Sequence, residues 1–181
     1  PGRQDELRYV LTSILPETSD SEFTWKDFQD RVNNELVAIL GNFVNRVMVL
    51  SHKYFDGKVL NGSDFNETDK AVFEELEKYP GLIEQSIGNY RFREALSHFM
   101  NAARLGNKYL ADQEPWKVFK TDQERVKTVL NVATQIVANL AILSQPFLPK
   151  TSTKLFEMLN LSQQDWYNAG KSDIIATDAQ L

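Results

Sequence analysis

The sequence predicts an all-α protein, a bundle of about five or six helices. Apolar residues recur at intervals of three and four along most of the chain, which is the period of one helix face. No stretch alternates apolar and polar residues over the length of a strand, and no unit of 20 to 50 residues repeats. With 181 residues and 42% hydrophobic content, the chain can bury a sizeable core. We therefore expect a globular helical bundle.

The N-terminal part predicts a short helix followed by a long one. The short helix covers residues 5–14 and stops before a proline, which cannot continue a helix. The long helix covers residues 25–55, with Thr24 as its N-cap and Gly57 beyond its end. Apolar side chains surround this helix between residues 37 and 50, so neighbours should cover it there on several sides.

The rest of the chain predicts four further helical segments. The first is broken near Pro80 and Gly81, because proline and glycine both weaken a helix interior. A long helix follows over residues 92–112, and its Gly106 should admit the close approach of another helix. Another long helix runs over residues 121–144, and the stretch PFLPKTSTKLFEML adds a last short one.

Composition excludes several classes of function. Without cysteine there is no disulfide framework and no thiolate metal site, which suits the reducing cytoplasm. We find no signal segment and no apolar run of bilayer-spanning length, so a soluble protein is expected. A net charge of −5 disfavours a broad, sequence-blind nucleic-acid binder, although a local basic site stays compatible with it. The sequence has no phosphate-binding glycine loop, nucleophile elbow or zinc motif, so no catalytic residue is assigned.

Polar residues interrupt the apolar stretch ILGNFVNRVMVL at Asn42, Asn45 and Arg46. Asn42 and Arg46 are four residues apart and therefore lie on one flank of the helix, whereas Asn45 points elsewhere. A buried guanidinium needs a partner, so one interpretation is an internal ion pair that fixes helix packing. The other is a recognition site, because an amide and a guanidinium fork together suit the edge of a nucleobase.

Trp116 stands directly after Pro115, in the stretch NKYLADQEPWKVFK. Proline is favoured at the first position of a helix, which places Trp116 in an exposed first turn. A rigid aromatic side chain there can stack on an unpaired base, with Lys117 and Lys120 near the phosphates. The alternative is that Trp116 fills the hydrophobic junction between two helices.

A family resemblance follows from these residues taken together. The opening DELRYVLTSILPETSDSEFTWKDF, the central GNFVNR and the later NKYLADQEPW and PFLPK resemble methionyl-tRNA synthetases, in the region after the catalytic domain. The similarity spans nearly the whole chain in order. It implies the helical anticodon-binding domain of a class I synthetase, which joins methionine to its tRNA at the expense of ATP.

The resemblance also implies residue roles and partners. Asn42 and Arg46 would hydrogen-bond base edges of the CAU anticodon of tRNA(Met), and Trp116 would stack on the first anticodon base. Supporting candidates are Tyr109, Asp112, Lys117 and Lys120. Residues 1–20 would link the helical domain, residues 21–181, to a missing catalytic domain of the same chain. The parent enzyme would use ATP with magnesium, and zinc in the missing part.

Two departures from the family pattern limit this interpretation. Relatives often carry an aspartate where this chain has Ala111, which leaves the acidic contribution of Asp112 open. The two adenylate-handling motifs are also missing, so the chain should not activate methionine alone, and we read it as a fragment. Two alternatives stay open at this point: a helical protein-interaction or scaffolding domain, and the equivalent domain of a related class I synthetase.

Overall fold

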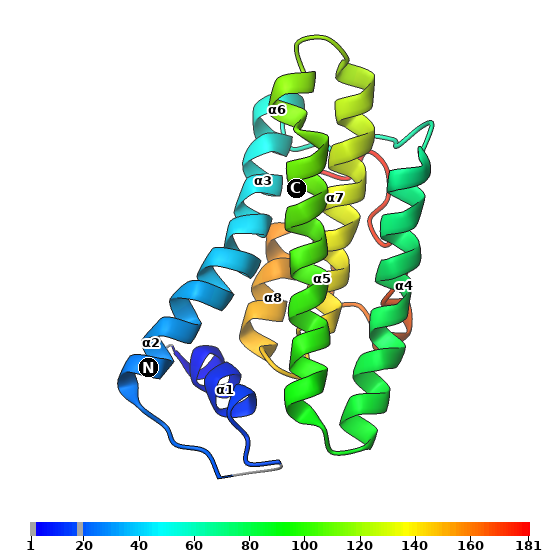
Figure 1. Cartoon of the computed structure of the whole chain (residues 1–181). Coiled ribbons are helices and arrows are strands. Elements are labelled where there is room, and N and C mark those ends of the chain that lie inside the picture. Colours follow the sequence, from blue (N-terminus) through cyan, green and yellow to red (C-terminus); the bar gives the residue numbers. More distant parts are fainter. Residues whose placement is uncertain (1–2, 18–19) are drawn as a thin grey trace.

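A computed structural model describes residues 3–17 and 20–181 (Figure 1). Residues 1–2 and 18–19, which belong to the expected linker, lie outside the described residues. Within the described ranges the elements are helices, and the one β-bridge is an isolated pair, so the all-α prediction is confirmed. In order they are α1 Gln4–Ser13, α2 Trp25–Arg31, η1 Val32–Gly41, α3 Asn42–Phe55, α4 Glu67–Gly88, α5 Phe92–Gln113, α6 Pro115–Val118, α7 Gln123–Leu143, α8 Pro149–Met158 and η2 Trp166–Asn168.

The long N-terminal helix forms with the expected ends but not with a uniform winding. α2, η1 and α3 follow one another as a continuous rod (Figure 1). Thr24 Oγ1 accepts a hydrogen bond from Asp27 N at 3.1 Å, and the rod ends where Asp56 takes a left-handed conformation with φ 52°. The ten residues of η1 are π-helical, although we expected a plain α-helix. A π-helix, in which hydrogen bonds join residues five apart, is rare and often marks a functional site.

The rod is less covered than its composition predicts. Val37 is 58% exposed and Val49 is 52% exposed, so the expectation of neighbours on several sides is wrong. Only one face of the rod, with Leu40, Phe43 and Val47, is buried against the bundle.

α4 is unbroken at Pro80, contrary to our expectation. A proline removes one backbone hydrogen bond and costs about 3 kcal/mol within a helix. α4 recovers this cost because it packs along the whole of α5 and buries side chains on both sides of Pro80, including Leu76, Tyr79 and Ile83. Packing against a neighbour therefore overrides the local sequence signal.

α7 forms the centre of the core. Its residues from Thr128 to Leu143 are all buried. By length and composition this helix could cross a membrane, which corrects our statement that no run approaches that length. However, 94% of the relevant window is buried inside the protein, as expected for the core helix of a bundle.

Polar side chains of α7 fix the C-terminal segment, for which the sequence predicts no structure. The Gln135 side chain donates to Ile175 O at 2.8 Å and accepts from Ile175 N at 3.0 Å. Asn139 donates to Lys171 O at 2.9 Å and accepts from Gly170 N at 2.6 Å. These amides satisfy backbone groups that secondary structure leaves unpaired, so residues 170–175 pack on α7 without forming a helix.

Three residues of the opening DELRY attach α1 to the bundle. Asp5 Oδ2 accepts from Thr151 N at 2.6 Å, in the first turn of α8. Arg8 donates to Phe147 O at 3.1 Å, just before α8 begins. Tyr9 is buried and donates to Glu35 in η1. The motif therefore fixes the short N-terminal helix against two distant parts of the chain.

The contact between α3 and α5 depends on a glycine. A Cβ atom added at Gly106 would lie 2.4 Å from Cζ of Phe43, well inside contact distance. The predicted close approach at Gly106 is therefore confirmed, and its partner is a fully buried phenylalanine ring.

We predict that Gly106→Ala lowers the free energy of unfolding, because Phe43 must leave its place. Overpacking of this kind costs about 1–3 kcal/mol. Gly81→Ala is the matched control, since a Cβ atom there meets nothing within 4 Å and should stabilise α4 by about 0.5–1 kcal/mol. Urea unfolding of both variants measures the difference. Equal effects of the two substitutions would contradict the packing argument.

Candidate nucleic-acid interface

Arg46 and Trp116 are neighbours in space although 70 residues separate them. Cζ of Arg46 lies 5.0 Å from the centroid of the Trp116 ring, in the geometry of a cation–π contact. Within the described ranges Arg46 forms no ion pair with a carboxylate, so the internal-pair interpretation finds no support. Trp116 is 36% exposed and therefore offers part of its ring to solvent.

The end of α5 determines where Trp116 lies. Glu114 takes a left-handed conformation with φ 42°, which breaks the helix and lets Pro115 begin α6. Pro115 is buried, so it anchors the turn while the next residue faces outward. Phe119 then stacks on Tyr54 of α3, with ring centroids 4.0 Å apart. α6 and the residue that follows it thus contact α3 at two places, at Arg46 and at Tyr54.

Asn42 lies one helical turn before Arg46 and is joined to α5. Its Nδ2 donates to Asn107 Oδ1 at 3.2 Å. Asn107 Nδ2 in turn donates to Ile39 O at 2.8 Å and to Ala103 O at 3.2 Å. Asn107 therefore connects the last π-helical turn, the side chain of Asn42 and α5. Sequence reasoning missed Asn107, because nothing in its own helix indicates that it faces a second one.

The supporting candidates separate into exposed and buried residues. Lys117 pairs with Glu114 at 2.6 Å and Asp112 pairs with Lys108 at 2.5 Å, all on the surface. Lys120 is exposed. Tyr109 is only 2% exposed, and its hydroxyl points into the protein, so it contributes to the fold and offers no surface to a ligand.

Tyr109 belongs to a buried network that holds the end of α5. Its hydroxyl donates to Asp69 Oδ1 at 2.6 Å, and Arg125 donates to both carboxylate oxygens of Asp69, at 2.5 and 2.8 Å. Arg125 Nη2 also donates to Gln113 Oε1 at 2.6 Å. Gln113 is the last residue of α5, so this network fixes the backbone three residues before Trp116.

Hydrogen bonding sets the ionisation of Asp69. Burial alone raises the pKa of this carboxyl, but hydrogen bonds from Arg125, from Tyr109 and from the backbone of Asn66 outweigh it. The pKa of Asp69 is therefore held below its ordinary value of 3.8. Burial raises the pKa of Tyr109 in the same network, and the neighbouring carboxylate of Asp69 raises it further.

Comparison with known proteins identifies the family. Residues 59–179 match the model of the anticodon binding domain of methionyl tRNA ligase, and residues 2–48 match the model of class I tRNA synthetases (M). The first match alone covers more than half of the chain. The chain belongs to the methionyl-tRNA ligase family. The resemblance found in the sequence is thereby confirmed, and the two alternatives left open there are no longer favoured.

Curated methionyl-tRNA ligases match over the whole chain. The methionine–tRNA ligase of Christiangramia forsetii is 57% identical over 181 residues, and that of Cytophaga hutchinsonii is 56% identical over 180 residues. The match covers 100% and 99% of this chain but only 26% of each relative. The chain therefore spans about a quarter of the length of these methionyl-tRNA ligases.

Solved structures of methionyl-tRNA synthetase share the fold. The apo form of the Mycobacterium tuberculosis enzyme superimposes with a TM-score of 0.90 and 25% identity, over 98% of this chain and 37% of that one. The same enzyme bound by methionyl-adenylate also gives a TM-score of 0.90. Asn42 and Arg46 fall within the synthetase match and Trp116 within the anticodon-domain match. The contact between Arg46 and Trp116 thus joins the two matched regions.

We predict that Asp69→Asn destabilises the protein at neutral pH. We also expect its free energy of unfolding to depend less on pH in the acid range. Because the folded-state pKa is lowered, the stabilisation is fully present above about pH 4 and is lost as the pH falls through the folded-state pKa. Removing one partner of a buried pair costs about 3–5 kcal/mol. Urea unfolding from pH 7 to pH 2 measures this, with the exposed Asp112→Asn as control. An unchanged pH profile would contradict the assigned role.

Proposed function

We propose that the surface formed by Asn42, Arg46 and Trp116 binds the CAU anticodon of tRNA(Met). The observation that carries the proposal is the contact between Arg46 and Trp116, since it brings a base-edge donor and a stacking platform together. Unpaired RNA bases are held by stacking on aromatic rings and by hydrogen bonds to their edges. Both chemistries are available on this exposed surface.

Each residue has a role that its contacts allow. Trp116 stacks on the first, splayed-out anticodon base. The guanidinium of Arg46, which has no carboxylate partner among the described residues, donates to base edges. Asn42 uses one Nδ2 hydrogen for Asn107 and keeps Oδ1 and the other hydrogen for a base. Lys117, Lys120 and Asp112 are exposed and lie within four residues of Trp116 in the chain, and we propose them as supporting residues.

Typical interaction energies favour stacking of a base on Trp116 over the contact between Arg46 and Trp116 in the free protein. An exposed cation–π pair such as Arg46 with Trp116 contributes about 0.5–1 kcal/mol. Stacking of a base on an aromatic side chain contributes about 1–3 kcal/mol. A base can therefore take the place of the guanidinium on the indole ring, which frees Arg46 to bind a base edge. The contact seen in the free protein keeps both side chains ordered until then.

In the complete enzyme, recognition of the anticodon would direct the ATP-dependent attachment of methionine to the tRNA, in the cytoplasm. ATP would bind the catalytic part with magnesium, and zinc would be held there. Across residues 3–17 and 20–181 no three histidine, aspartate or glutamate side chains gather as a metal site requires. The proposed contribution of this chain is RNA binding.

We also propose that residues 1–20 connect the helical domain, residues 21–181, to the catalytic part. Large apolar side chains on the synthetase-matched segment support this, because Leu7 and Leu11 are 41% and 46% exposed and Trp25, just beyond the linker, is 74% exposed. Exposed apolar groups gathered on one segment are typical of a surface that another part covers. The relatives, about four times longer than this chain, contain such a part.

We predict that Trp116→Ala weakens binding of an RNA stem-loop with a CAU anticodon by roughly 5- to 150-fold, the loss expected for one stacked base. Fluorescence anisotropy at fixed salt measures the affinity, and a stem-loop with an altered anticodon measures the selectivity. Trp25→Ala is the matched control, since it removes an exposed tryptophan elsewhere. The proposal fails if Trp116→Ala binds the CAU stem-loop as well as the unmodified protein does.

If the catalytic part packs against this exposed apolar segment, the surroundings of Trp25, just beyond the linker, should change. A variant that carries Trp116→Phe and Trp166→Phe keeps Trp25 as its single tryptophan. In this chain acrylamide should quench its fluorescence readily, because the ring is exposed. Fusion to the catalytic part of the Cytophaga hutchinsonii relative should protect it. Equal quenching in both proteins would rule out the proposed packing.

A further inference from the structure

The charges of the protein are unevenly distributed between its helices. The net charge is −5, yet residues 36–55 and residues 95–111 contain no aspartate and no glutamate. These two stretches make up the end of η1, the whole of α3 and most of α5. On the other side of α5 from α3 lies α4 (Figure 1), whose sequence carries six carboxylates. The two stretches that carry Asn42, Arg46 and Asn107 are therefore free of acidic residues.

Cations follow one stripe of α5. At 100° per residue, Arg93, Arg104 and Lys108 fall within about 60° of one another. All three are exposed. At a rise of 1.5 Å per residue they cover about 22 Å of the helix. Lys108 directly follows Asn107, so the stripe begins beside Asn42 and leads away from it. We call Arg93, Arg104 and Lys108 the basic stripe.

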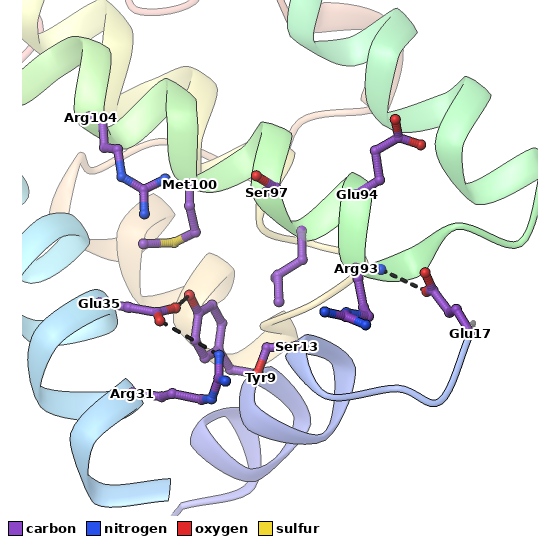
Figure 2. A pocket seen from close by; sticks show the side chains of 11 residues that line it. Tyr9, Ser13, Glu17, Arg31, Glu35, Arg93, Glu94, Ser97, Met100 and Arg104 are labelled. Atoms are coloured by element: carbon purple, nitrogen blue, oxygen red, sulfur yellow. Dashed lines mark hydrogen bonds and ion pairs between the residues drawn. The ribbon is translucent and has the colours of Figure 1, made fainter. Parts of the chain in front are cut away.

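The far end of the basic stripe opens into a cavity of about 400 Å³ between α1, η1 and α5 (Figure 2). Arg93 and Arg104 both line it, and Figure 2 shows their guanidinium groups within the cavity region. Ser13 and Ser97 add hydroxyl groups to the lining. The cavity therefore offers the donors that bind a phosphate oxygen.

The carboxylates around this cavity already have other partners. Glu35 accepts from the buried Tyr9 and lies 3.8 Å from Arg31 (Figure 2). Glu17 accepts from the backbone N–H of Arg93 at 2.9 Å. Glu94 lies 3.5 Å from Arg91. In the part of the chain that the structure describes, neither Arg93 nor Arg104 forms an ion pair, so both charges are available to a ligand.

The third cation of the stripe is held only weakly. Lys108 pairs with Asp112 at 2.5 Å, and both side chains are largely exposed. Exposed pairs of this kind contribute about 0–1 kcal/mol, so an incoming phosphate can replace the carboxylate at little cost.

We propose that the basic stripe and its cavity bind the phosphate backbone of the RNA whose loop bases meet Trp116. The inference rests on the proposed function and adds a second contact surface to it. Bases at Trp116 and Asn42 supply selectivity, whereas the stripe holds the strand that leads away from the loop and is indifferent to sequence. An overall acidic protein can bind RNA in this way, because the carboxylates near the stripe already have partners of their own.

The double variant Arg93→Gln with Arg104→Gln tests the proposal. Affinity for the CAU stem-loop is measured by anisotropy from 50 to 200 mM KCl. The logarithm of the affinity falls as the logarithm of the salt concentration rises, and losing two phosphate contacts should make this slope less steep by about 1.8. Binding should weaken roughly 10- to 60-fold at 0.1 M salt. A stem-loop with an altered anticodon should lose the same factor, so that selectivity is unchanged. Trp116→Ala should show the opposite pattern, with lost selectivity and an unchanged slope.

A charge-matched control is Lys70→Gln with Lys78→Gln, which changes the same net charge on α4. It should leave the salt slope unaltered. An unchanged slope in the Arg93 and Arg104 variant overturns the inference, and so does an equal loss in the α4 control.

Binding of a polyglutamate peptide with the same dependence on Arg93 and Arg104 would assign the stripe to an acidic protein instead. If the unmodified protein does not prefer the CAU stem-loop, the proposed function fails, while the slope still reports on the stripe.

Discussion

The close packing of Phe43 against Gly106 sets the distance between α3 and α5, and the candidate site depends on that distance. A side chain at Gly106 would hold the two helices apart, because its Cβ atom would meet the phenylalanine ring at 2.4 Å. With the helices in contact, Asn107 reaches both Ile39 O and the side chain of Asn42. Arg46, one turn further along α3, then lies over the ring of Trp116. Packing in the core thus determines the arrangement of polar groups on the surface.

The other half of the site depends on a buried polar network. Asp69, Tyr109 and Arg125 bring together the start of α4, the end of α5 and the start of α7, and Gln113 attaches the last residue of α5 to them. A network of this kind is costly unless every member is hydrogen-bonded, and here its members satisfy one another. The stacking of Phe119 on Tyr54 holds the next helix to α3. Trp116 is therefore presented by a rigid turn although it is partly exposed.

Much of the candidate site could be predicted from short-range rules. The four-residue spacing places Asn42 and Arg46 on one flank, and Pro115 places Trp116 in the first turn of a helix. Asn107 could not be found in this way, because its partners lie 65 and 68 residues away in the chain. The basic stripe was also missed, since net charge averages over faces that only the fold separates. Pro80 shows the same limit, because packing along α5 offsets the local cost of a proline.

The sequence by itself determined the all-α class, most helix ends, the family and the residue types able to read a base. These properties depend on periodicity, capping residues and motif order, which involve residues close together in the chain or in a fixed succession. Only the tertiary structure decided the π-helical winding of η1, the exposure of Val37, the continuity of α4 and the meeting of Arg46 with Trp116. Each of these depends on contacts between helices distant in sequence, where the free energy of packing exceeds local preference.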